Sequence, residues 1–245
     1  MRTLRFYLPH PLVVGEYIQV PDNTSRHISQ VLRLREGEEV TVFNGNNCEY
    51  TAVISGIEKK SVQLKILTEL QRSKESGIQI HLIQGISKGD RMDWVIQKAT
   101  ELGVTSIQPV NSKRTNVNLS LNRADKKLAH WSGIINSACE QCGRNLLPEL
   151  HAVMDLNTVV KDHYFSQIDN KIILNPFSSS KLQQTDMPGS QFVLAIGPEG
   201  GFDPLEIKNL EEAGFKSFSL GPRILRTETA AIAGITLLQA LFGDL

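Results

Sequence analysis

The sequence predicts an α/β protein in which a mainly parallel sheet, covered by helices, follows a small β-barrel. Two observations support this. Short strands separated by turn residues fill the first 70 residues, and from Ile78 onward strands alternate with helical stretches. That alternation is typical of a mainly parallel sheet, because each parallel connection must cross back over the sheet. The polar stretch 71–77 lacks apolar periodicity, so we expect one domain at 1–71 and a second at 72–245.

The first domain is expected to contain at least three strands and one short helix. The strands cover 38–43, 49–54 and 62–67, and Asn44-Gly45-Asn46-Asn47 is a turn signal between the first two. The helix is expected at 23–32, with Asp22 as its cap. These short elements indicate a small β-barrel.

The second domain is expected to begin with the strand at 78–84. Further strands are expected at 105–110, 171–174, 192–196 and 216–220. A helix at 91–102 begins after Asp90 and stops at Gly103; Met92, Val95, Ile96, Ala99 and Leu102 line one face. The last helix, 228–242, is apolar nearly all round, which predicts burial in the core or against a second subunit.

Charge distribution and hydropathy limit the classes of function that the protein can have. The chain has 245 residues with 26 basic and 26 acidic side chains, but residues 71–150 hold 11 basic and 7 acidic ones and residues 151–245 hold 7 and 11. This asymmetry is either chance clustering or a segment that contacts a polyanion such as RNA. No apolar run reaches the roughly 18 residues that span a bilayer, and the N-terminal stretch lacks a signal-peptide layout. We therefore expect a cytoplasmic protein without a membrane anchor.

A glycine-rich corner follows the expected strand at 192–196. Gly197, Gly200 and Gly201 lie in the loop, and the next helix begins with Asp203 as cap and Glu206 completing a capping box. Glycines at the carboxyl end of a parallel strand let backbone approach a ligand closely. The alternative is an ordinary tight connection between a strand and a helix.

A second corner follows the strand at 216–220 and contains Gly221 and Pro222. Thr227 is placed to cap the final helix, and Arg226 and Glu228 lie where polar side chains can enter a pocket. Because ligands of open α/β sheets bind outside the carboxyl ends of strands, two such corners predict a single pocket. The alternative for Arg226 and Glu228 is a surface ion pair at a helix start.

Several common site motifs are missing from the sequence. There is no dinucleotide fingerprint, phosphate-binding loop, nucleophile elbow or zinc-protease motif. Cys139 and Cys142 form a lone Cys-x-x-Cys pair in a helical stretch, whereas a structural zinc needs four ligands. With Cys48 they are too few for a disulfide framework, and we expect no metal.

At these residues the sequence resembles the ribosomal RNA small subunit methyltransferase E family, and the resemblance covers nearly the whole chain. The two glycine corners are its most specific blocks. The shared residues are His27, Val31-Leu32-Arg33, Gly37, Lys88-Gly89-Asp90-Arg91, Gln97-Lys98-Ala99-Thr100-Glu101-Leu102-Gly103, Arg114, Trp131, Glu140-Gln141-Cys142-Gly143-Arg144-Asn145, Ile196-Gly197-Pro198-Glu199-Gly200-Gly201, Leu220-Gly221 and Ile224-Leu225-Arg226-Thr227-Glu228-Thr229-Ala230.

The resemblance implies a PUA-like RNA-binding barrel followed by a SPOUT methyltransferase domain with a C-terminal trefoil knot. It also implies a homodimer that uses S-adenosylmethionine to methylate N3 of a specific uridine of 16S rRNA within the small ribosomal subunit. The implied cofactor residues are Leu174, Asn175, Ile196, Gly197, Gly201, Leu220, Leu225, Arg226 and Thr229.

Chemistry and charge suggest further roles. Arg226 is expected to stabilise the developing uracil oxyanion, and Glu199 or Glu228 to take the N3 proton; the sequence does not choose between the carboxylates. An RNA-facing surface is expected to include Arg33, Arg35, Lys88, Arg91, Arg114 and Arg144. Alternatives are a SPOUT enzyme acting on a ribose hydroxyl or another RNA, and a non-catalytic RNA-binding protein.

Overall fold

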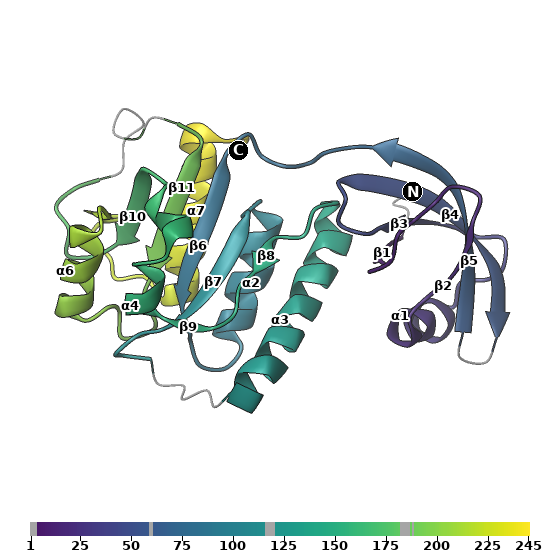
Figure 1. Cartoon of the computed structure of the whole chain (residues 1–245), viewed down its shortest axis with the longest axis horizontal. Helices are drawn as coiled ribbons and strands as arrows, with labels where there is room; N and C mark the ends of the chain where they lie inside the picture. The colour runs from purple at the N-terminus through teal and green to yellow at the C-terminus, as the bar shows by residue number, and fades with distance from the viewer. Residues whose placement is uncertain (1–3, 59–60, 116–120, 182–186, 188) are drawn as a thin grey trace. The chain divides into compact units, whose positions relative to one another are not determined.

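The computed structural model describes residues 4–58, 61–115, 121–181, 187 and 189–245 (Figure 1). The chain divides into two compact units. The first contains Met1–Glu75 together with Asn136–Leu147, and the second contains Ser76–Ile135 and Pro148–Leu245. Asn136–Leu147 lies within the range that the sequence assigned to the second domain, so the chain returns to the first unit after leaving it.

A five-stranded sheet forms the N-terminal unit, in the order β1-β3-β4-β5-β2. The strands are β1 (Arg5–Tyr7), β2 (Tyr17–Gln19), β3 (Glu39–Phe43), β4 (Cys48–Glu58) and β5 (Ser61–Gln71). β1 pairs with β3 in parallel, and the other pairs are antiparallel. Alternate side chains of β4 and β5, such as Ile54 and Leu64, enter one apolar core. The three expected strands are confirmed, and β1 and β2 add an edge on each side.

The expected helix of this unit begins within one residue of its expected start, but its second half is π-helical instead of α-helical. α1 (Asp22–Arg26) runs directly into a π-helical turn, η1 (His27–Val31). Pro21, not Asp22, is the cap residue, and no side chain caps the helix. Arg33 follows with φ of 56°, a left-handed conformation that is uncommon for a residue with a Cβ.

Arg144 has a different place from the one expected. It follows α3 (Leu121–Cys142) and lies in Asn136–Leu147, the segment that belongs to the first unit. Its exposed fraction is only 4%. Its guanidinium forms an ion pair with Glu75. Nearby, Arg5 donates to the side-chain oxygen of Asn145 at 2.6 Å. Because Arg144 is buried and its charge is compensated, we remove it from the RNA-facing set.

The C-terminal unit is built on a seven-stranded parallel sheet, in the order β12-β10-β11-β6-β7-β8 with β9 also paired to β7. Its strands are β6 (Gln79–Gly85), β7 (Ser106–Asn111), β8 (Glu149–Leu150), β9 (Met154–Asp155), β10 (Asn170–Leu174), β11 (Gln191–Ile196) and β12 (Lys216–Phe218). The five expected strands are confirmed. Because β12, β10 and β11 are neighbours and parallel, the segments that follow them meet at one edge of the sheet.

Helices cover both faces of this sheet (Figure 1). α2 (Arg91–Glu101) packs against α7 (Thr227–Phe242), and α7 also contacts β11. On the opposite face, α4 (Leu156–Val159), α5 (His163–Ser166) and α6 (Pro204–Glu212) share an apolar core with β6, β10 and β11. One side of α7 is fully buried, and the other is only half-buried although it is also apolar.

The helix caps expected from the sequence are confirmed in one case of three in this unit. Asp203 accepts from the Leu205 N–H, and Glu206 closes the capping box. Asp90 precedes α2 but its side chain makes no cap bond. Thr227 lies inside the first turn of α7, after the cap residue Arg226, and its hydroxyl is used elsewhere.

A buried histidine lies at the amino ends of the central strands, away from the glycine corners. His81 of β6 is 2% exposed and its Nδ1 is 2.8 Å from the Ser106 hydroxyl. The rings of Tyr164 and Phe165 pack edge-on against it. Burial, with a smaller contribution from the charge of nearby His151, lowers the pKa of His81 from 6.5 to about 4.

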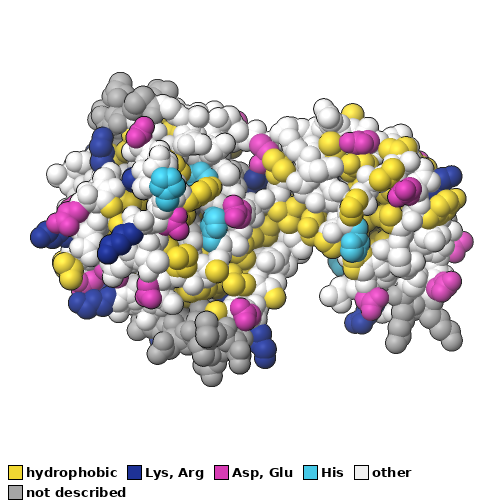
Figure 2. All heavy atoms as spheres, viewed as in Figure 1, with side chains coloured by type: hydrophobic (Ala, Val, Ile, Leu, Met, Phe, Trp, Pro, Cys, Tyr) yellow, Lys and Arg dark blue, Asp and Glu magenta, His cyan; other side chains and the backbone are white. Residues whose placement is uncertain are grey.

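The surface carries mixed charge. On the face that Figure 2 shows, basic and acidic side chains are interspersed in both units, without a large patch of one sign among the described residues. The charge asymmetry along the sequence therefore does not become a single basic face in this view. Among the described residues, no helix is long and apolar enough to cross a membrane.

Candidate functional site

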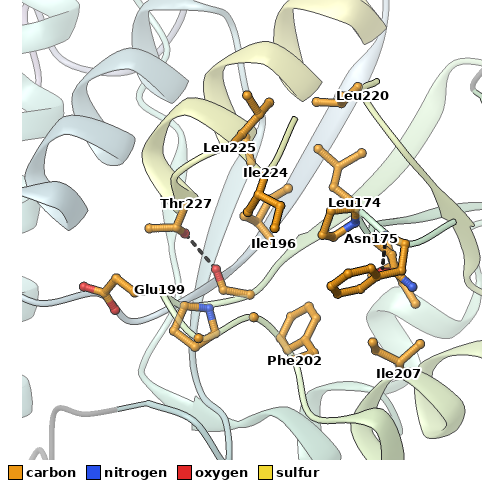
Figure 3. A pocket seen from close by; sticks show the side chains of 18 of the residues that line it. Leu174, Asn175, Ile196, Glu199, Phe202, Ile207, Leu220, Ile224, Leu225 and Thr227 are labelled. Carbon is orange, nitrogen blue, oxygen red and sulfur yellow. Dashed lines mark hydrogen bonds between the residues drawn. The ribbon is translucent and has the colours of Figure 1, made fainter. Parts of the chain in front are cut away.

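A cavity of about 320 Å³ lies at the carboxyl ends of β10, β11 and β12, beside the first turn of α7 (Figure 3). Both glycine corners contribute to it, as the sequence predicts. The lining residues are Arg114, Ile173, Leu174, Asn175, Pro176, Phe177, Ile196, Gly197, Pro198, Glu199, Gly200, Gly201, Phe202, Ile207, Phe218, Leu220, Gly221, Arg223, Ile224, Leu225, Thr227 and Ala230. Leucine and isoleucine side chains from three strand ends converge in it, which suits a ligand with an apolar body.

The first corner is a tight turn that folds back on itself. The Gly201 N–H donates to the Pro198 carbonyl at 2.8 Å, and Gly201 has φ of 67°. A Cβ on Gly197 would lie 2.7 Å from the backbone nitrogen of Phe202. The sequence predicts that glycine at 197 lets a ligand approach, but the chain's own backbone already occupies that space.

The end of β6 packs just as closely on this turn. A Cβ on Gly85 would lie 2.5 Å from the nitrogen of Pro198. Glycine is therefore needed on both sides of this contact, because any Cβ is closer than atoms tolerate. The position of the turn relative to the sheet is fixed by backbone contact.

The Thr227 hydroxyl holds α7 to the same corner. It donates to the Gly197 carbonyl at 2.7 Å and accepts from the Gln84 side-chain amide at 3.0 Å. Figure 3 shows the first of these bonds beside the cavity. One buried hydroxyl thus joins the ends of β6 and β11 to the start of α7, which a side chain capping its own helix could not do.

On its outer side the turn is bound by a backbone N–H before α2 and by a cation of α2. The Glu199 carboxylate accepts from the Lys88 N–H at 2.8 Å and from the Arg91 guanidinium at 2.7 Å. Burial alone would raise the pKa of Glu199, but these hydrogen bonds outweigh it and hold the pKa below its ordinary value. In Figure 3 the carboxylate points away from the leucine and isoleucine side chains.

Two cations bind the turn from the end of β7. Arg114 donates to the Gly200 carbonyl at 3.0 Å and lies 3.7 Å from the Asp203 carboxylate. The Lys113 ammonium is 3.5 Å from the same carboxylate. The hydrogen bond from the Leu205 N–H, followed by these charges, lowers the pKa of Asp203. Asp203 therefore stays ionised and caps α6 while holding this segment.

The second corner runs beside the segment that follows β10. The Asn175 N–H donates to the Phe218 carbonyl at 2.9 Å, and the Ser219 N–H donates to the Ser180 carbonyl at 3.0 Å. Gly221 then turns the chain with φ of 107°, a conformation that favours glycine. These bonds place the stretch from Leu220 to Leu225 over the cavity.

Seven of the nine residues expected to bind the cofactor line this cavity. They are Leu174, Asn175, Ile196, Gly197, Gly201, Leu220 and Leu225. The other two, Arg226 and Thr229, have exposed side chains and are not part of the lining. Of the expected catalytic residues, Glu199 lines the cavity, whereas Glu228 lies half-buried in the first turn of α7.

Glu228 has an unusual oxygen. Its Oε2 is buried and has no hydrogen-bond partner among the described residues. A buried carboxylate oxygen without a donor is costly, so such a group indicates a missing partner or a chemical role. Arg226 precedes it at the cap position of α7, where the helix dipole adds positive potential.

Sequence reasoning missed several lining residues. Phe177, Phe202 and Phe218 are the largest apolar ones, and Ile224 is another. Phe177 follows β10 at the same edge of the sheet, so the rule that ligands bind beyond strand ends would have found it. Ile224 lies in the second corner itself, but only its exposure in the structure distinguishes it from a core residue.

The Cys-x-x-Cys pair lies outside this site, near the end of α3. Cys139 is fully buried and burial raises the pKa of its thiol to about 12, so it stays protonated. Cys142 is partly buried, and its sulfur is 4.0 Å from the Cys139 carbonyl. A protonated buried thiol is neither a metal ligand nor a nucleophile.

Models of two protein families match the chain. The RNA methyltransferase domain matches residues 74–239, and the RNA methyltransferase PUA domain matches residues 20–67. The first match covers the seven-stranded sheet and the cavity, and the second covers most of the N-terminal sheet. Together they confirm the expected order of a PUA-like domain followed by an α/β methyltransferase domain of the SPOUT type.

Full-length relatives agree with these models. The ribosomal RNA small subunit methyltransferase E of Buchnera aphidicola subsp. Schizaphis graminum is 37% identical over all of this chain and 98% of its own length. The enzyme of the same name from Neisseria gonorrhoeae, solved with S-adenosyl methionine, is 43% identical over 99% of both chains with a TM-score of 0.93. A methyltransferase from Legionella pneumophila, solved with the same cofactor, is 42% identical over both whole chains with a TM-score of 0.95. The chain therefore belongs to the ribosomal RNA small subunit methyltransferase E family.

Proposed function

We propose that the protein transfers a methyl group from S-adenosylmethionine to N3 of a specific uridine of 16S rRNA in the small ribosomal subunit. The observation that carries this proposal is the cavity at the two glycine corners, which holds seven of the nine residues implied to bind the cofactor. The two relatives solved with this cofactor are more than 40% identical over almost the whole chain, which supports the same ligand here.

The cavity suits the cofactor in size and in the chemistry of its walls. A volume of about 320 Å³ lies within the range of small-molecule sites, and its walls are mostly apolar with a few backbone polar groups. At Gly201 and Gly221 an added Cβ would meet no atom of the described residues within 4 Å, so the backbone there is open to a ligand. We propose that Leu174, Leu220 and Leu225 hold the apolar body, with Arg226 and Thr229 acting at its edge. When bound, the cofactor supplies an activated methyl group on its sulfonium.

The residues of this chain then have to align the uridine and manage one proton. We propose that Arg226 stabilises negative charge on the uracil, because its side chain is exposed beside the corner and makes no hydrogen bond or ion pair with the described residues. For the proton we favour Glu228 over Glu199. The unpartnered Oε2 of Glu228 can accept a proton, whereas Glu199 is held as an ionised carboxylate by Lys88 and Arg91.

RNA binding is proposed for the exposed cations of both units. Arg33 and Arg35 belong to the N-terminal unit, and Lys88, Arg91 and Arg114 belong to the C-terminal unit. Arg91 and Arg114 already bind Glu199 and the Gly200 carbonyl, so each would contact phosphate while also holding the first corner. Their charge should make RNA affinity fall steeply with salt, through release of counterions.

We further propose that the protein is a homodimer and acts in the cytoplasm, where ribosomal RNA is present. The half-buried side of α7 supports the dimer. Ile232, Ala233, Thr236 and Leu237 present an uncharged surface there, and a second copy packed around a two-fold axis would bury it. Sedimentation at micromolar concentration should show a dimer for the intact chain and a monomer for Leu237→Arg. A monomer in both cases would contradict the dimer.

Two measurements test the enzymatic proposal. Calorimetry should show S-adenosylmethionine binding to the full chain, and the absence of binding would leave a non-catalytic RNA-binding protein as the function. Mass spectrometry of digested ribosomal RNA, from a deletion strain with and without the gene restored, should show a methyl group on a uracil base. Methylation of a ribose hydroxyl, or of another RNA, would replace the proposed substrate.

A further inference from the structure

Phe177 is the most exposed large apolar side chain of the described residues, and the chain holds it in a fixed turn. The phenylalanine is 84% exposed and lines the cavity. The Asn175 side-chain oxygen accepts from the Phe177 N–H at 3.1 Å, and the Asn175 carbonyl accepts from the Ser178 N–H at 3.1 Å. The Ser178 hydroxyl donates to the Ser217 carbonyl at 2.7 Å, which anchors the turn to β12. The ring is therefore presented outward from a well-bonded backbone.

A second exposed apolar side chain lines the same cavity from the other corner. Ile224 is 77% exposed and lies between Gly221 and the start of α7. Arg223 beside it is exposed and makes no hydrogen bond or ion pair with any described residue. Arg91 and Arg114 at the first corner are paired, whereas Arg223, like Arg226, has no such partner among the described residues. We call Phe177, Arg223 and Ile224 the lip of the cavity.

The composition of the lip suits a nucleic acid. An exposed aromatic ring stacks on any nucleobase, and an unpaired guanidinium binds the neighbouring phosphate. The charge argues against the cofactor as the occupant, because S-adenosylmethionine carries two positive groups and one negative, whereas RNA is a polyanion. The more enclosed side chains, such as Ile196 and Leu225, already supply an apolar wall for the cofactor deeper in the cavity.

We propose that the lip receives the target nucleotide of the RNA as it leaves the base stack. The pyrimidine ring lies between Phe177 and Ile224, and Arg223 binds its phosphate. A base must be unstacked before its N3 edge can reach a buried methyl donor, and a stacking surface at the cavity mouth offsets part of that cost. This inference rests on the proposed function and adds the residues that position the substrate.

The test compares Phe177→Ala, Phe177→Trp and Phe177→Leu in the full-length protein, with small ribosomal subunits that lack the modification as the RNA. Phe177→Ala should raise KM for the subunits about tenfold and leave the affinity for S-adenosylmethionine unchanged, because one stacking contact is lost. Phe177→Trp should restore KM and Phe177→Leu should not, since only an aromatic ring stacks. The matched control is Leu205→Ala, which removes a leucine that is 60% exposed on α6 and outside the lip, and it should behave as wild type.

Arg223→Gln tests the phosphate contact. It should weaken binding and reduce the salt dependence of log affinity by about one unit of slope, while Lys208→Gln on the exposed side of α6 should not. Binding of the subunits is measured without cofactor, so this result is independent of whether the protein methylates them. A loss of cofactor affinity in Phe177→Ala with unchanged RNA binding would assign the ring to the cofactor and overturn the lip. Equal effects of Leu205→Ala and Phe177→Ala would overturn it as well.

Discussion

At the scale of single residues, the two carboxylates beside the glycine corners differ in their partners. Glu199 accepts two hydrogen bonds and its pKa lies below the ordinary value, so it is a weak proton acceptor. Glu228 has a buried oxygen that accepts nothing among the described residues. Both are glutamates at or just after a glycine corner in the sequence, and only their surroundings in the fold distinguish a structural anion from a candidate base.

Exchanging each carboxylate for its amide separates the two roles. Glu228→Gln should slow methyl transfer about a hundredfold or more at neutral pH and regain activity as pH rises, because the uracil then loses its proton to solvent. Glu199→Gln should weaken the turn held by Lys88 and Arg91 and lower cofactor affinity, without recovery at high pH. Single-turnover rates of both variants, measured at saturating cofactor from pH 6 to pH 9, show which carboxylate takes the proton. Recovery of Glu199→Gln instead of Glu228→Gln would reverse the assignment.

Arg226 is tested through the chemical step. Removing one donor to a developing oxyanion costs on the order of 3–4 kcal/mol, so Arg226→Ala should lower the rate of methyl transfer at least about a hundredfold while RNA binding falls much less. Arg226→Lys should recover part of the rate, since it keeps the charge and loses the planar fork. If saturating cofactor restores the rate of Arg226→Ala, Arg226 binds the cofactor and has no catalytic role.

At the scale of elements, the first corner is shaped by contacts within the protein. Gly85 and Gly197 lie against the backbone of the same turn, and Thr227 bonds that turn to α7. The strand end, the turn and the helix start are therefore held together by direct contact. A substitution in any one of them should disturb the cavity walls before it meets a ligand.

Gly197→Ala tests this packing. The new Cβ would lie 2.7 Å from the Phe202 nitrogen, so the turn must shift, and we expect a loss of about 1–3 kcal/mol in the free energy of unfolding, with weaker cofactor binding. The control is Gly133→Ala in α3, where an added Cβ would lie within 4 Å of no atom in the described part of the chain and alanine favours the helix. Urea denaturation of both variants gives the comparison. A wild-type midpoint for Gly197→Ala would contradict the close packing.

At the scale of the whole molecule, the cavity and a buried histidine that affects stability lie at opposite ends of the strands of one sheet. The carboxyl ends of β10, β11 and β12 carry the cavity, and the amino ends of β6 and β7 carry His81 and Ser106. His81 is buried in its neutral form, with a pKa of about 4 against 6.5 for a free histidine. The unfolded chain therefore binds a proton at a higher pH than the folded one does.

The stability of the fold should consequently fall as pH drops from 6.5 to about 4. Above 6.5 the His81 contribution is fully present, and below that value each pH unit removes at most about 1.4 kcal/mol until the folded protein also binds the proton. His81→Asn, which keeps a polar partner for Ser106, should flatten this decline. Urea midpoints at pH 7 and pH 5 measure it, and an identical decline in the variant would assign the effect to other groups.

Much of the C-terminal domain can be predicted because parallel strands buried on both faces read as continuous apolar runs, as in Phe192–Ile196. What local pattern cannot show is tertiary. Nothing near Arg144 in the sequence reveals that it pairs with Glu75, and nothing near Gly197 reveals that Phe202 folds back on it. The exposure of Phe177 is equally invisible, since an aromatic residue after a strand usually enters the core. The glycine motifs predict where the cavity lies, but only the folded structure distinguishes the enclosed residues of its walls from the exposed residues at its opening.

The Thr227 hydroxyl also sets when the protein can begin to work during its own synthesis. Its partner Gln84 is made 143 residues earlier and its partner Gly197 30 residues earlier. At roughly 5–20 residues per second, Thr227 is made on the order of ten seconds after Gln84, the residue whose amide donates to its hydroxyl. A nascent chain that ends before α7 has made every strand of the sheet and still lacks one wall of the cavity. Labelled S-adenosylmethionine should accordingly bind to chains that have been released from the ribosome. It should not bind to nascent chains stalled before α7, so it should pass through a column that holds them.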